Sequence, residues 1–348
     1  PLLHQTAYDF FLKRMADGLP VEEIAATGSQ WVGNDVLAVR QFNDSMLHEL
    51  FGIATQMKRM VKQHGKVDLL RGRVLANVFY EPSTRTMCSF DAAMKRLGGD
   101  VISVSESTSS AKKGETIEDT VRCLQCYCDI LVLRHPEEGT AARAAAAASK
   151  PVINAGDGVG EHPTQALLDL YTITTAASVA DGPTSLAGKT LTLLGDLKHG
   201  RTVHSLALLT SRLQSPPRLQ LVSPSSLAMP QAICDELEVR KVQVECTTEI
   251  APVLARTDVL YVTRVQRERF ASAAEYEAVR GCYVVDRTLM AAAPMQMIVM
   301  HPLPRVDEIS PDVDDDPRAR YFEQMENGMY VRMALLALVL GADLSSLD

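Results

Sequence analysis

The chain has 348 residues, of which 46% are hydrophobic and 22% charged, which is ordinary for a globular protein and enough for two domains. Its formal net charge of −8 argues against a general nucleic-acid-binding or anionic-membrane surface, so an anionic ligand requires a local cluster of cations. No apolar run reaches the length of a membrane span, and no secretory signal is present.

The chain start and the cysteines give two further expectations. The sequence begins at Pro1 without a methionine, from which we expect a piece of a longer protein. Its seven cysteines are odd in number and scattered, which favours reduced thiols and a cytoplasmic location. Cys123, Cys126 and Cys128 lie in an apolar run with no fourth ligand at zinc spacing, so we expect small core residues and no metal.

The first half of the chain predicts a parallel α/β domain. Its pattern is helical to about Gly65, with one clear helix over Phe42–Val61. Short β-branched runs then alternate with helical patterns. The predicted strands are Val74–Tyr80, Val101–Val104, Ile130–Leu133 and Val152–Asn154, and the helices are Met87–Leu97, Ile117–Tyr127 and Thr140–Ser149.

The second half repeats this alternation. A longer helix over Ala166–Ala177 is followed by a connector rich in Gly, Pro and Ser, Ser178–Gly188. The predicted strands that follow are Thr190–Leu194, Leu219–Val222, Val242–Glu245, Val259–Thr263 and Ile298–Met300, and the helices are Thr202–Leu213, Pro230–Arg240, Arg269–Val279 and Gly328–Leu340. Two such series predict two parallel-sheet domains, each with helices on both faces.

The segment from Glu81 to Thr86 follows the first strand and leads into a helix. Free backbone N–H groups, the helix dipole and the guanidinium of Arg85 would converge there on an anion such as phosphate. A plain helix N-cap is the alternative, because Ser and Thr are favoured at that position anyway.

Polar motifs follow five of the predicted strands. Any one of them fits a solvated strand end, but ligands in parallel sheets bind at the carboxyl ends of the strands. The five segments are Arg134–Pro136, Gly156–Gln165, Gly195–Thr202, Thr263–Gln266 and His301–Arg305. Neither a Gly-x-Gly-x-x-Gly nor a Walker A motif occurs, which disfavours a nicotinamide-binding protein.

These motifs resemble those of the aspartate carbamoyltransferases (aspartate transcarbamoylases) from about Asp35 to Leu340. Ser-Thr-Arg-Thr at 83–86 is typical of carbamoyltransferases in general. The marks of the aspartate enzymes are SSAKKGET at 109–116, GDLKHGRT at 195–202, RVQRER at 264–269 and HPLPR at 301–305. An ornithine enzyme would carry Cys where Pro302 stands. In GDGVGEHPTQALLDL, 156–170, the chain is most similar to the transcarbamoylase domain of the fused eukaryotic pyrimidine-synthesis protein.

The resemblance implies an α/β protein of two parallel-sheet domains joined by a long interdomain helix, with a C-terminal helix packing back on the first domain. Residues 1–165, completed by helix 326–348, would bind carbamoyl phosphate, and 166–325 would bind aspartate. The expected reaction forms N-carbamoyl-L-aspartate and phosphate, an early step of de novo pyrimidine (UMP) biosynthesis. No cofactor or metal is implied.

The resemblance also assigns residue roles. Catalytic roles are implied for five residues: Arg85, Thr86, Lys113, Arg134 and His162. Of these, Thr86, Arg134 and His162 would form an oxyanion hole. The residues implied to bind carbamoyl phosphate are Ser83, Thr84, Arg85, Thr86, Ser109, Lys113, Arg134, His162, Gln165, Pro302 and Leu303. Those implied to bind aspartate are Lys113, Arg134, Arg201, Arg264 and Gln266.

Two implied features join separate parts of the assembly. Ser109 and Lys113 would reach from one subunit into the site of its neighbour, giving shared active sites in a homotrimer; by loop statistics alone they belong to a solvated surface loop. Glu81 would pair with Arg201 and Arg269 as an interdomain clamp, although both arginines equally suit ordinary surface pairs. Fusion to other pyrimidine-pathway enzymes is also implied.

Three other functions remain open at this point. The nearest is a carbamoyltransferase for another amine acceptor such as ornithine, against which Arg264 and Gln266 argue. A catalytically inactive anion-binding or scaffold domain is the second, and a two-domain dehydrogenase is the most distant.

Overall fold

The computed structural model describes residues 30–106, 109–176, 185–270 and 272–347, and these residues form two compact units. The first comprises the described parts of Pro1–Leu37, Gln56–Gly158 and Arg332–Asp348, and the second comprises Ala38–Thr55 and Val159–Val331. The expected helical start of the chain up to residue 29, and most of the expected connector, lie outside the described residues.

The first unit is built on a parallel four-stranded sheet in the order β2-β1-β3-β4. Its strands are β1 (Val74–Phe79), β2 (Asp100–Ser105), β3 (Ile130–His135) and β4 (Val152–Asp157). Its own helices are α3 (Thr84–Arg96), α4 (Ile117–Leu124) and α5 (Thr140–Ala147), with short 3-10 turns η3 (Ser110–Lys113) and η7 (Ser345–Leu347).

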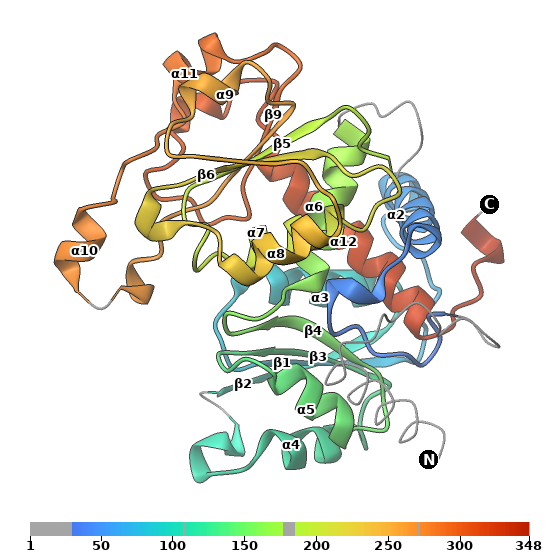
Figure 1. Cartoon of the computed structure of the whole chain (residues 1–348). Helices are drawn as coiled ribbons and strands as arrows, with labels where there is room; N and C mark the ends of the chain where they lie inside the picture. Colours follow the sequence, from blue (N-terminus) through green and yellow to red (C-terminus); the bar gives the residue numbers. More distant parts are fainter. Residues whose placement is uncertain (1–29, 107–108, 177–184, 271, 348) are drawn as a thin grey trace. The chain divides into compact units, whose positions relative to one another are not determined.

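Alternate residues of these strands face opposite layers of helices. Ala76 and Val78 of β1 join a buried cluster with Val121 of α4 and Ala144 of α5. Asn77, between them in sequence, points the other way, where its amide donates to the backbone oxygen of Met87 on α3 at 3.4 Å. Figure 1 shows α4 and α5 on one face of the sheet and α3 on the other.

The second unit holds a parallel five-stranded sheet in the order β7-β6-β5-β8-β9. Its strands are β5 (Thr190–Leu194), β6 (Arg218–Val222), β7 (Val244–Thr247), β8 (Val259–Val262) and β9 (Ile298–Met300). Its own helices are α6 (Pro163–Ala176), α7 (Arg201–Thr210), α8 (Gln231–Val239), α9 (Ala251–Leu254), α10 (Ala273–Glu277) and α11 (Arg287–Ala292), and its 3-10 turns are η1 (Val39–Gln41), η4 (Ser225–Leu227), η5 (Arg267–Arg269) and η6 (Pro311–Val313).

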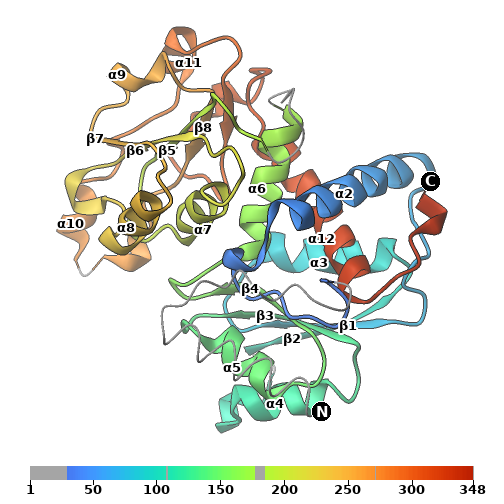
Figure 2. The same cartoon turned by 45° about the vertical axis from the view of Figure 1, so that its right-hand side comes forward.

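This sheet is also covered on both faces. Leu260 and Val262 of β8 pack in a buried cluster with Val253 of α9 and Met290 of α11. The intervening Tyr261 points to the opposite face, where its hydroxyl reaches Asp169 of α6 at 2.7 Å. Figure 2 shows α9 and α11 on one side of the sheet and α7 and α8 on the other.

Two long helices contribute residues to both units. Helix α2 (Asp44–His64) belongs to the second unit through Thr55, and α12 (Tyr321–Val339) belongs to it through Val331. In the first unit, α12 packs on α3: Arg332 donates to the Ser89 hydroxyl at 2.9 Å, and its guanidinium lies 5.1 Å from the centre of the Phe90 ring. Among the described residues, no helix combines the length and the apolar character needed to cross a membrane.

The expected fold class, two parallel-sheet α/β domains, is confirmed. The main differences concern helices: α9 and α11 were not predicted, and α12 begins at Tyr321 rather than Gly328. The expected helix Arg269–Val279 is instead the turn η5 followed by α10, whose N-cap Ser272 accepts a hydrogen bond from the Glu275 N–H at 3.3 Å.

The expectation that three neighbouring cysteines are all core residues is wrong for two of them. Cys128 is buried, but Cys123 and Cys126 are exposed, because Cys123 lies on the solvent side of α4 and Cys126 lies in the turn that follows it. Burial raises the pKa of the Cys128 thiol to about 11, so it stays protonated near neutral pH. The described residues contain no group of three His, Cys, Asp or Glu side chains arranged to hold a metal ion.

Candidate active site

In the first unit, the segment from Glu81 to Thr86, the candidate anion-binding segment, lies where the strand order of the sheet reverses. The chain leaves β1 for β2 on one side and returns to β3 on the other, so the loops after β1 and β3 diverge at this point. Such a switch point is where parallel sheets bind ligands. Phe79 is the register partner of Arg134, and the Tyr80 N–H donates to the Arg134 carbonyl at 2.8 Å, so residues 80–86 begin beside Arg134.

The start of α3 fits an anion better than a plain helix cap. Ser83 occupies the N-cap position with an extended backbone, yet its hydroxyl accepts no hydrogen bond from the first turn. The first N–H groups of a helix have no partner within the helix. In α3 these belong to Thr84, Arg85 and Thr86, and no acidic side chain lies in the first turn. The helix N-terminus therefore offers donors and a positive potential to an anion.

Arg134 is fixed as a buried cation beside this segment. One guanidinium nitrogen, Nη2, lies 2.6 Å from the Glu81 carboxylate, and Nη1 donates to the backbone oxygen of Ala155 at 3.1 Å. Its side chain is only 9% exposed, and the Glu81 side chain 23% exposed. The ion pair offsets the cost of burying the guanidinium and limits its motion. Glu81 thus contacts Arg134 within its own unit, and the clamp to Arg201 and Arg269 stays a prediction.

Ser109 and Lys113 lie on the polar segment between β2 and α4. The Ser109 hydroxyl donates to the Glu106 backbone oxygen at 3.3 Å, and both Lys112 and Lys113 are exposed in η3. Thr116 caps α4 through a 3.1 Å hydrogen bond from the Asp119 N–H. The segment is therefore anchored at its end and presents its lysines to solvent.

In the second unit, the strand order reverses between β5 and β8. Gly195 follows β5 with a φ of 120°, and a Cβ built there would lie 2.3 Å from the backbone oxygen of Thr263, the residue after β8. Only glycine fits this close approach of two strand ends. The segments that carry Arg201 and Arg264 therefore leave the sheet next to each other.

A buried carboxylate shapes the turn before Arg201. Asp196 is fully buried and accepts hydrogen bonds from the N–H groups of Lys198 and His199 at 3.2 and 3.0 Å. It also contacts the His199 ring at 3.1 Å. Arg201 then forms the first residue of α7, which begins after Gly200. Asp196 thereby fixes the turn that leads into Arg201.

The segment after β8 is tied to the same turn. The Gln266 amide donates to the backbone oxygen of His199 at 3.3 Å, and Thr263 donates to that of Asp196 at 3.4 Å. Arg264 is partly buried, whereas Arg269 is exposed in η5. The structure thus brings the loops of Arg201, Arg264 and Gln266 together, as expected for residues that bind one small ligand.

His162 and Gln165 stand at the start of α6. His162 is 3% exposed, and its N–H donates to the Ser205 hydroxyl of α7 at 3.1 Å. Gln165 is 6% exposed and donates through Nε2 to Asp169 at 2.8 Å. The backbone of His162 and the side chain of Gln165 are therefore held by other parts of the second unit.

The loop after β9 is built around a histidine–carboxylate pair, His301 and Glu308. The Leu303 N–H donates to His301 Nδ1 at 2.8 Å, so the ring carries its proton on Nε2, 2.7 Å from Glu308. Burial tends to raise the pKa of Glu308, but hydrogen bonds from His301 and from backbone N–H groups outweigh it and hold the pKa below its usual value. Leu303 has a φ of 54°, a conformation unusual for a side chain of its size.

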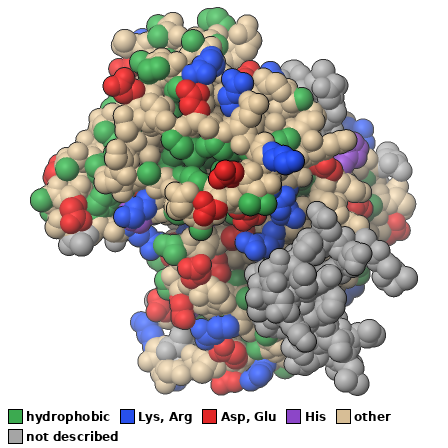
Figure 3. Space-filling model, in the orientation of Figure 1, with side chains coloured by type: hydrophobic (Ala, Val, Ile, Leu, Met, Phe, Trp, Pro, Cys, Tyr) green, Lys and Arg blue, Asp and Glu red, His purple; other side chains and the backbone are tan. Residues whose placement is uncertain are grey.

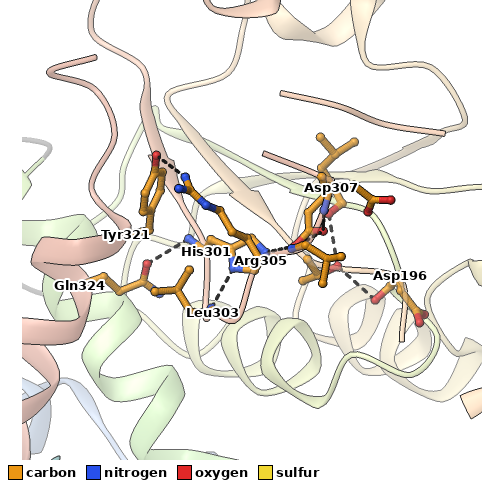
Figure 4. Close-up of polar contacts among 11 residues, drawn as sticks. Asp196, His301, Leu303, Arg305, Asp307, Tyr321 and Gln324 are labelled. Carbon is orange, nitrogen blue, oxygen red and sulfur yellow. Dashed lines mark hydrogen bonds and ion pairs between the residues drawn. The ribbon is translucent and has the colours of Figure 1, made fainter. Parts of the chain in front are cut away.

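The end of this loop is fixed by Arg305. Its Nη2 lies 2.6 Å from the Asp314 carboxylate, and its guanidinium stacks 5.4 Å from the centre of the Tyr321 ring. Figure 4 shows the Arg305 side chain turned toward Tyr321. Arg305 therefore stabilises the loop through its contacts with Asp314 and Tyr321.

The charged surface is mixed in sign. On the face in Figure 3, described Lys and Arg side chains are interspersed with Asp and Glu rather than gathered in one field. The cations of the two switch points thus act locally, as the net charge of −8 requires.

Three supporting side chains were not expected from the sequence: Asp169, Asp196 and Glu308. All are buried acids that accept hydrogen bonds from the loops described above. A signal was present for Asp169, because it is the one charged residue of the otherwise apolar run Ala166–Tyr171.

Family models match both halves of the chain. Residues 34–175 match the aspartate/ornithine carbamoyltransferase carbamoyl-P binding domain, and 187–339 match the Asp/Orn binding domain of the same family. Together the two matches cover most of the chain.

Individual relatives agree with the models. Over 310 residues, 89% of the chain, it is 54% identical to the multifunctional protein pyr1-3 of Dictyostelium discoideum, but it spans only 14% of that protein's length. It is 48% identical to the aspartate carbamoyltransferase catalytic subunit of Thermoplasma acidophilum, covering 88% of this chain and 98% of that one. Among solved structures, aspartate transcarbamoylase of Trypanosoma cruzi with carbamoyl phosphate and aspartate superposes with a TM-score of 0.84 at 43% identity, covering 90% of this chain and 98% of the other.

Proposed function

Because the chain belongs to the aspartate/ornithine carbamoyltransferase family, we propose that it is an aspartate carbamoyltransferase. It joins carbamoyl phosphate to L-aspartate and releases N-carbamoyl-L-aspartate and phosphate, an early step of pyrimidine synthesis. The observation that carries the proposal is the placement of arginines at both switch points: Arg85 and Arg134 in the first sheet, Arg201 and Arg264 in the second. The substrates bring one phosphate and two carboxylates, which need such fixed cations.

The first unit supplies the phosphate-binding groups. Ser83, Thr84, Arg85 and Thr86 hold the phosphate at the start of α3, where N–H groups and the helix dipole favour an anion. Ser109 and Lys113 of a neighbouring subunit complete this set in a homotrimer with shared sites. Lys113 acts as a point charge on both the phosphate and the aspartate.

The carbamoyl group is polarised by three donors. Thr86, Arg134 and His162 bind its carbonyl oxygen, on which negative charge develops when the amine of aspartate attacks. Arg134 also contacts aspartate. The departing phosphate accepts the proton of the amine, so positioning and charge stabilisation suffice for catalysis without a separate base. Gln165 and the backbone oxygens of Pro302 and Leu303 hold the carbamoyl NH2.

Aspartate is bound by the second unit. Arg201 takes the α-carboxylate, and Arg264 with Gln266 takes the side-chain carboxylate, which selects aspartate over ornithine. Glu81 pairs with Arg201 and Arg269 when substrates are bound. In this proposal, residues 1–165 with the C-terminal segment 326–348 form the carbamoyl phosphate domain, residues 166–325 form the aspartate domain, and a long helix joins them.

Two features extend beyond the chain itself. The chain is one domain of a multienzyme protein, a proposal supported by its 54% and 51% identity to two multifunctional proteins. The parent protein is cytoplasmic, which agrees with seven unpaired cysteines among the described residues.

The test is a colorimetric assay of the purified chain with carbamoyl phosphate and either aspartate or ornithine. Carbamoylation of aspartate with little or none of ornithine supports the proposal. Turnover of ornithine alone would reassign the acceptor, and turnover of neither would leave an anion-binding domain.

A further inference from the structure

The second unit contains a buried polar network centred on Asp169. Asp169 is fully buried, and its Oδ1 accepts hydrogen bonds from Nε2 of Gln165 at 2.8 Å and from Nε2 of Gln324 at 2.6 Å. Its Oδ2 accepts from the Tyr261 hydroxyl at 2.7 Å. Burial, then the Asp169 charge, raise the pKa of Tyr261 well above its usual value, so this hydroxyl remains a donor.

A carboxylate in this position decides how both glutamine amides are turned. An ionised carboxylate only accepts hydrogen bonds, so the NH2 end of each amide must face Asp169. For Gln324, this leaves Oε1 to accept the His301 N–H at 3.0 Å. For Gln165, it turns Oε1 away from Asp169. One buried charge thus fixes the donor and acceptor ends of two side chains.

The loop after β9 is also restricted to accepting hydrogen bonds. The His301 N–H is taken by Gln324, and the Leu303 N–H by the His301 ring (Figure 4). Pro302 and Pro304 carry no N–H at all. The backbone of residues 301–304 therefore offers a ligand only its carbonyl oxygens.

Gln165 and this loop belong to one connected group. Three hydrogen bonds lead from Gln165 through Asp169 and Gln324 to His301, with distances of 2.8, 2.6 and 3.0 Å. Resting on the function proposed above, we propose that Asp169 is a positioning residue that makes the carbamoyl subsite acceptor-only and so selects an NH2 group over a methyl group. A polar site built for a donor rejects an analogue that lacks it, because the acceptors are then left buried without a partner.

Acetyl phosphate is the matched probe, because it replaces the NH2 of carbamoyl phosphate by a methyl group of similar size. The affinities of the full chain for both compounds are measured by calorimetry or by competition. We expect the wild-type protein to prefer carbamoyl phosphate clearly. In Asp169→Asn, the side chain can donate as well as accept, so it no longer fixes the orientation of the two glutamine amides. We expect the ratio of the affinity for carbamoyl phosphate to that for acetyl phosphate to fall about tenfold or more.

Gln324→Leu is the second variant, and it decides the question should Asp169→Asn fail to fold. It breaks the connection to the His301 N–H while retaining the hydrogen bond between Gln165 and Asp169, and we expect the same fall in the ratio. Thr192→Val is the control, because Thr192 lies in a separate buried cluster with Gln220 and Thr257, at 2.7 and 2.8 Å, on the same sheet. It should lower thermal stability without changing the ratio.

A purely structural role for Asp169 predicts a different result. Both affinities would then fall in parallel, or remain unchanged with only a lower melting temperature, and either outcome overturns the inference. Failure of the proposed function is distinguishable, because the wild-type protein would then show no preference for carbamoyl phosphate before any substitution is made.

Discussion

The two sheets use the same location for their candidate binding residues but build it in different ways. In the first, the N-terminus of α3 provides backbone donors next to Arg85, and the buried cation Arg134 is paired with Glu81. In the second, the loops of Arg201 and Arg264 are fixed by hydrogen bonds of Asp196 and Gln266 to the backbone of His199. A helix N-terminus suits a phosphate, whose oxygens point in several directions, while separately positioned guanidinium groups suit the planar carboxylates of aspartate.

The largest expected effect is on the phosphate side of this comparison. Arg85→Ala should lower carbamoyl transfer about 10³-fold, because a charge-assisted contact at the phosphate is lost. The far-UV spectrum should stay unchanged, since Arg85 is exposed. Arg96→Ala, at the C-terminal end of the same helix, is the control and should keep normal activity. Near-normal transfer by Arg85→Ala would refute the phosphate assignment.

The next largest effect concerns the exposed lysine of η3. Lys113→Ala should lower transfer about 10²-fold through loss of a point charge on both substrates, whereas Lys112→Ala should change it little. When inactive Lys113→Ala and Arg85→Ala proteins exchange subunits, mixed trimers should regain about a third of their sites. Absence of recovery, with exchange confirmed by mass spectrometry, would contradict a lysine supplied by the neighbouring subunit.

On the carboxylate side, the expected effect is smaller and selective. Arg264→Ala should raise the KM for aspartate about 10- to 100-fold and leave binding of carbamoyl phosphate nearly unchanged. The neighbouring Arg267, whose guanidinium lies 6.0 Å from the centre of the Tyr276 ring, provides the control substitution Arg267→Ala. An equal loss of affinity for aspartate and for carbamoyl phosphate would show that the two sheets do not bind the two substrates separately.

The smallest expected effect lies at the amino end of the first sheet, away from its candidate ligand-binding edge. Asp35 accepts the Val152 N–H at 2.8 Å, and burial raises its pKa from 3.8 to about 6 despite that hydrogen bond. The folded state therefore holds a proton that the unfolded state releases, so stability falls between about pH 4 and pH 6 by about 1–3 kcal/mol.

Asp35→Asn removes this loss. Thermal unfolding should show the variant gaining stability relative to wild type as the pH rises from 4 to 7, with unchanged carbamoyl transfer. A stability difference that does not change with pH would contradict the raised pKa.

The sequence predicted the sheets and the strand-end residues because both follow from local patterns. Thr190–Leu194 and Ile298–Met300 were predicted with their observed bounds, since β-branched and aliphatic runs bounded by turn residues specify buried strands. Helix α3 begins three residues earlier than predicted, at Thr84, because the hydroxyl residues expected to precede the helix form its first turn.

What the sequence did not predict depends on contacts between distant segments. Asp169 and Gln324 are 155 residues apart, and nothing local to either indicates the 2.6 Å hydrogen bond between them. Helix α12 was predicted to begin at Gly328, yet Gly328 lies inside the helix, buried together with Asn327 and Tyr330. Short helices such as α11 depend on a single cap, here Asp286, whose carboxylate accepts the Leu289 N–H at 2.8 Å.

The most direct measurement is a crystal structure of the chain with N-(phosphonacetyl)-L-aspartate, a compound that bound to the related Trypanosoma cruzi enzyme. We predict its phosphonate at the start of α3, against Ser83–Thr86, and its carboxylates on Arg201 and Arg264, with Lys113 supplied by a second copy. A phosphonate bound elsewhere, or guanidinium groups of Arg85 and Arg264 directed at different molecules of the compound, would contradict the account.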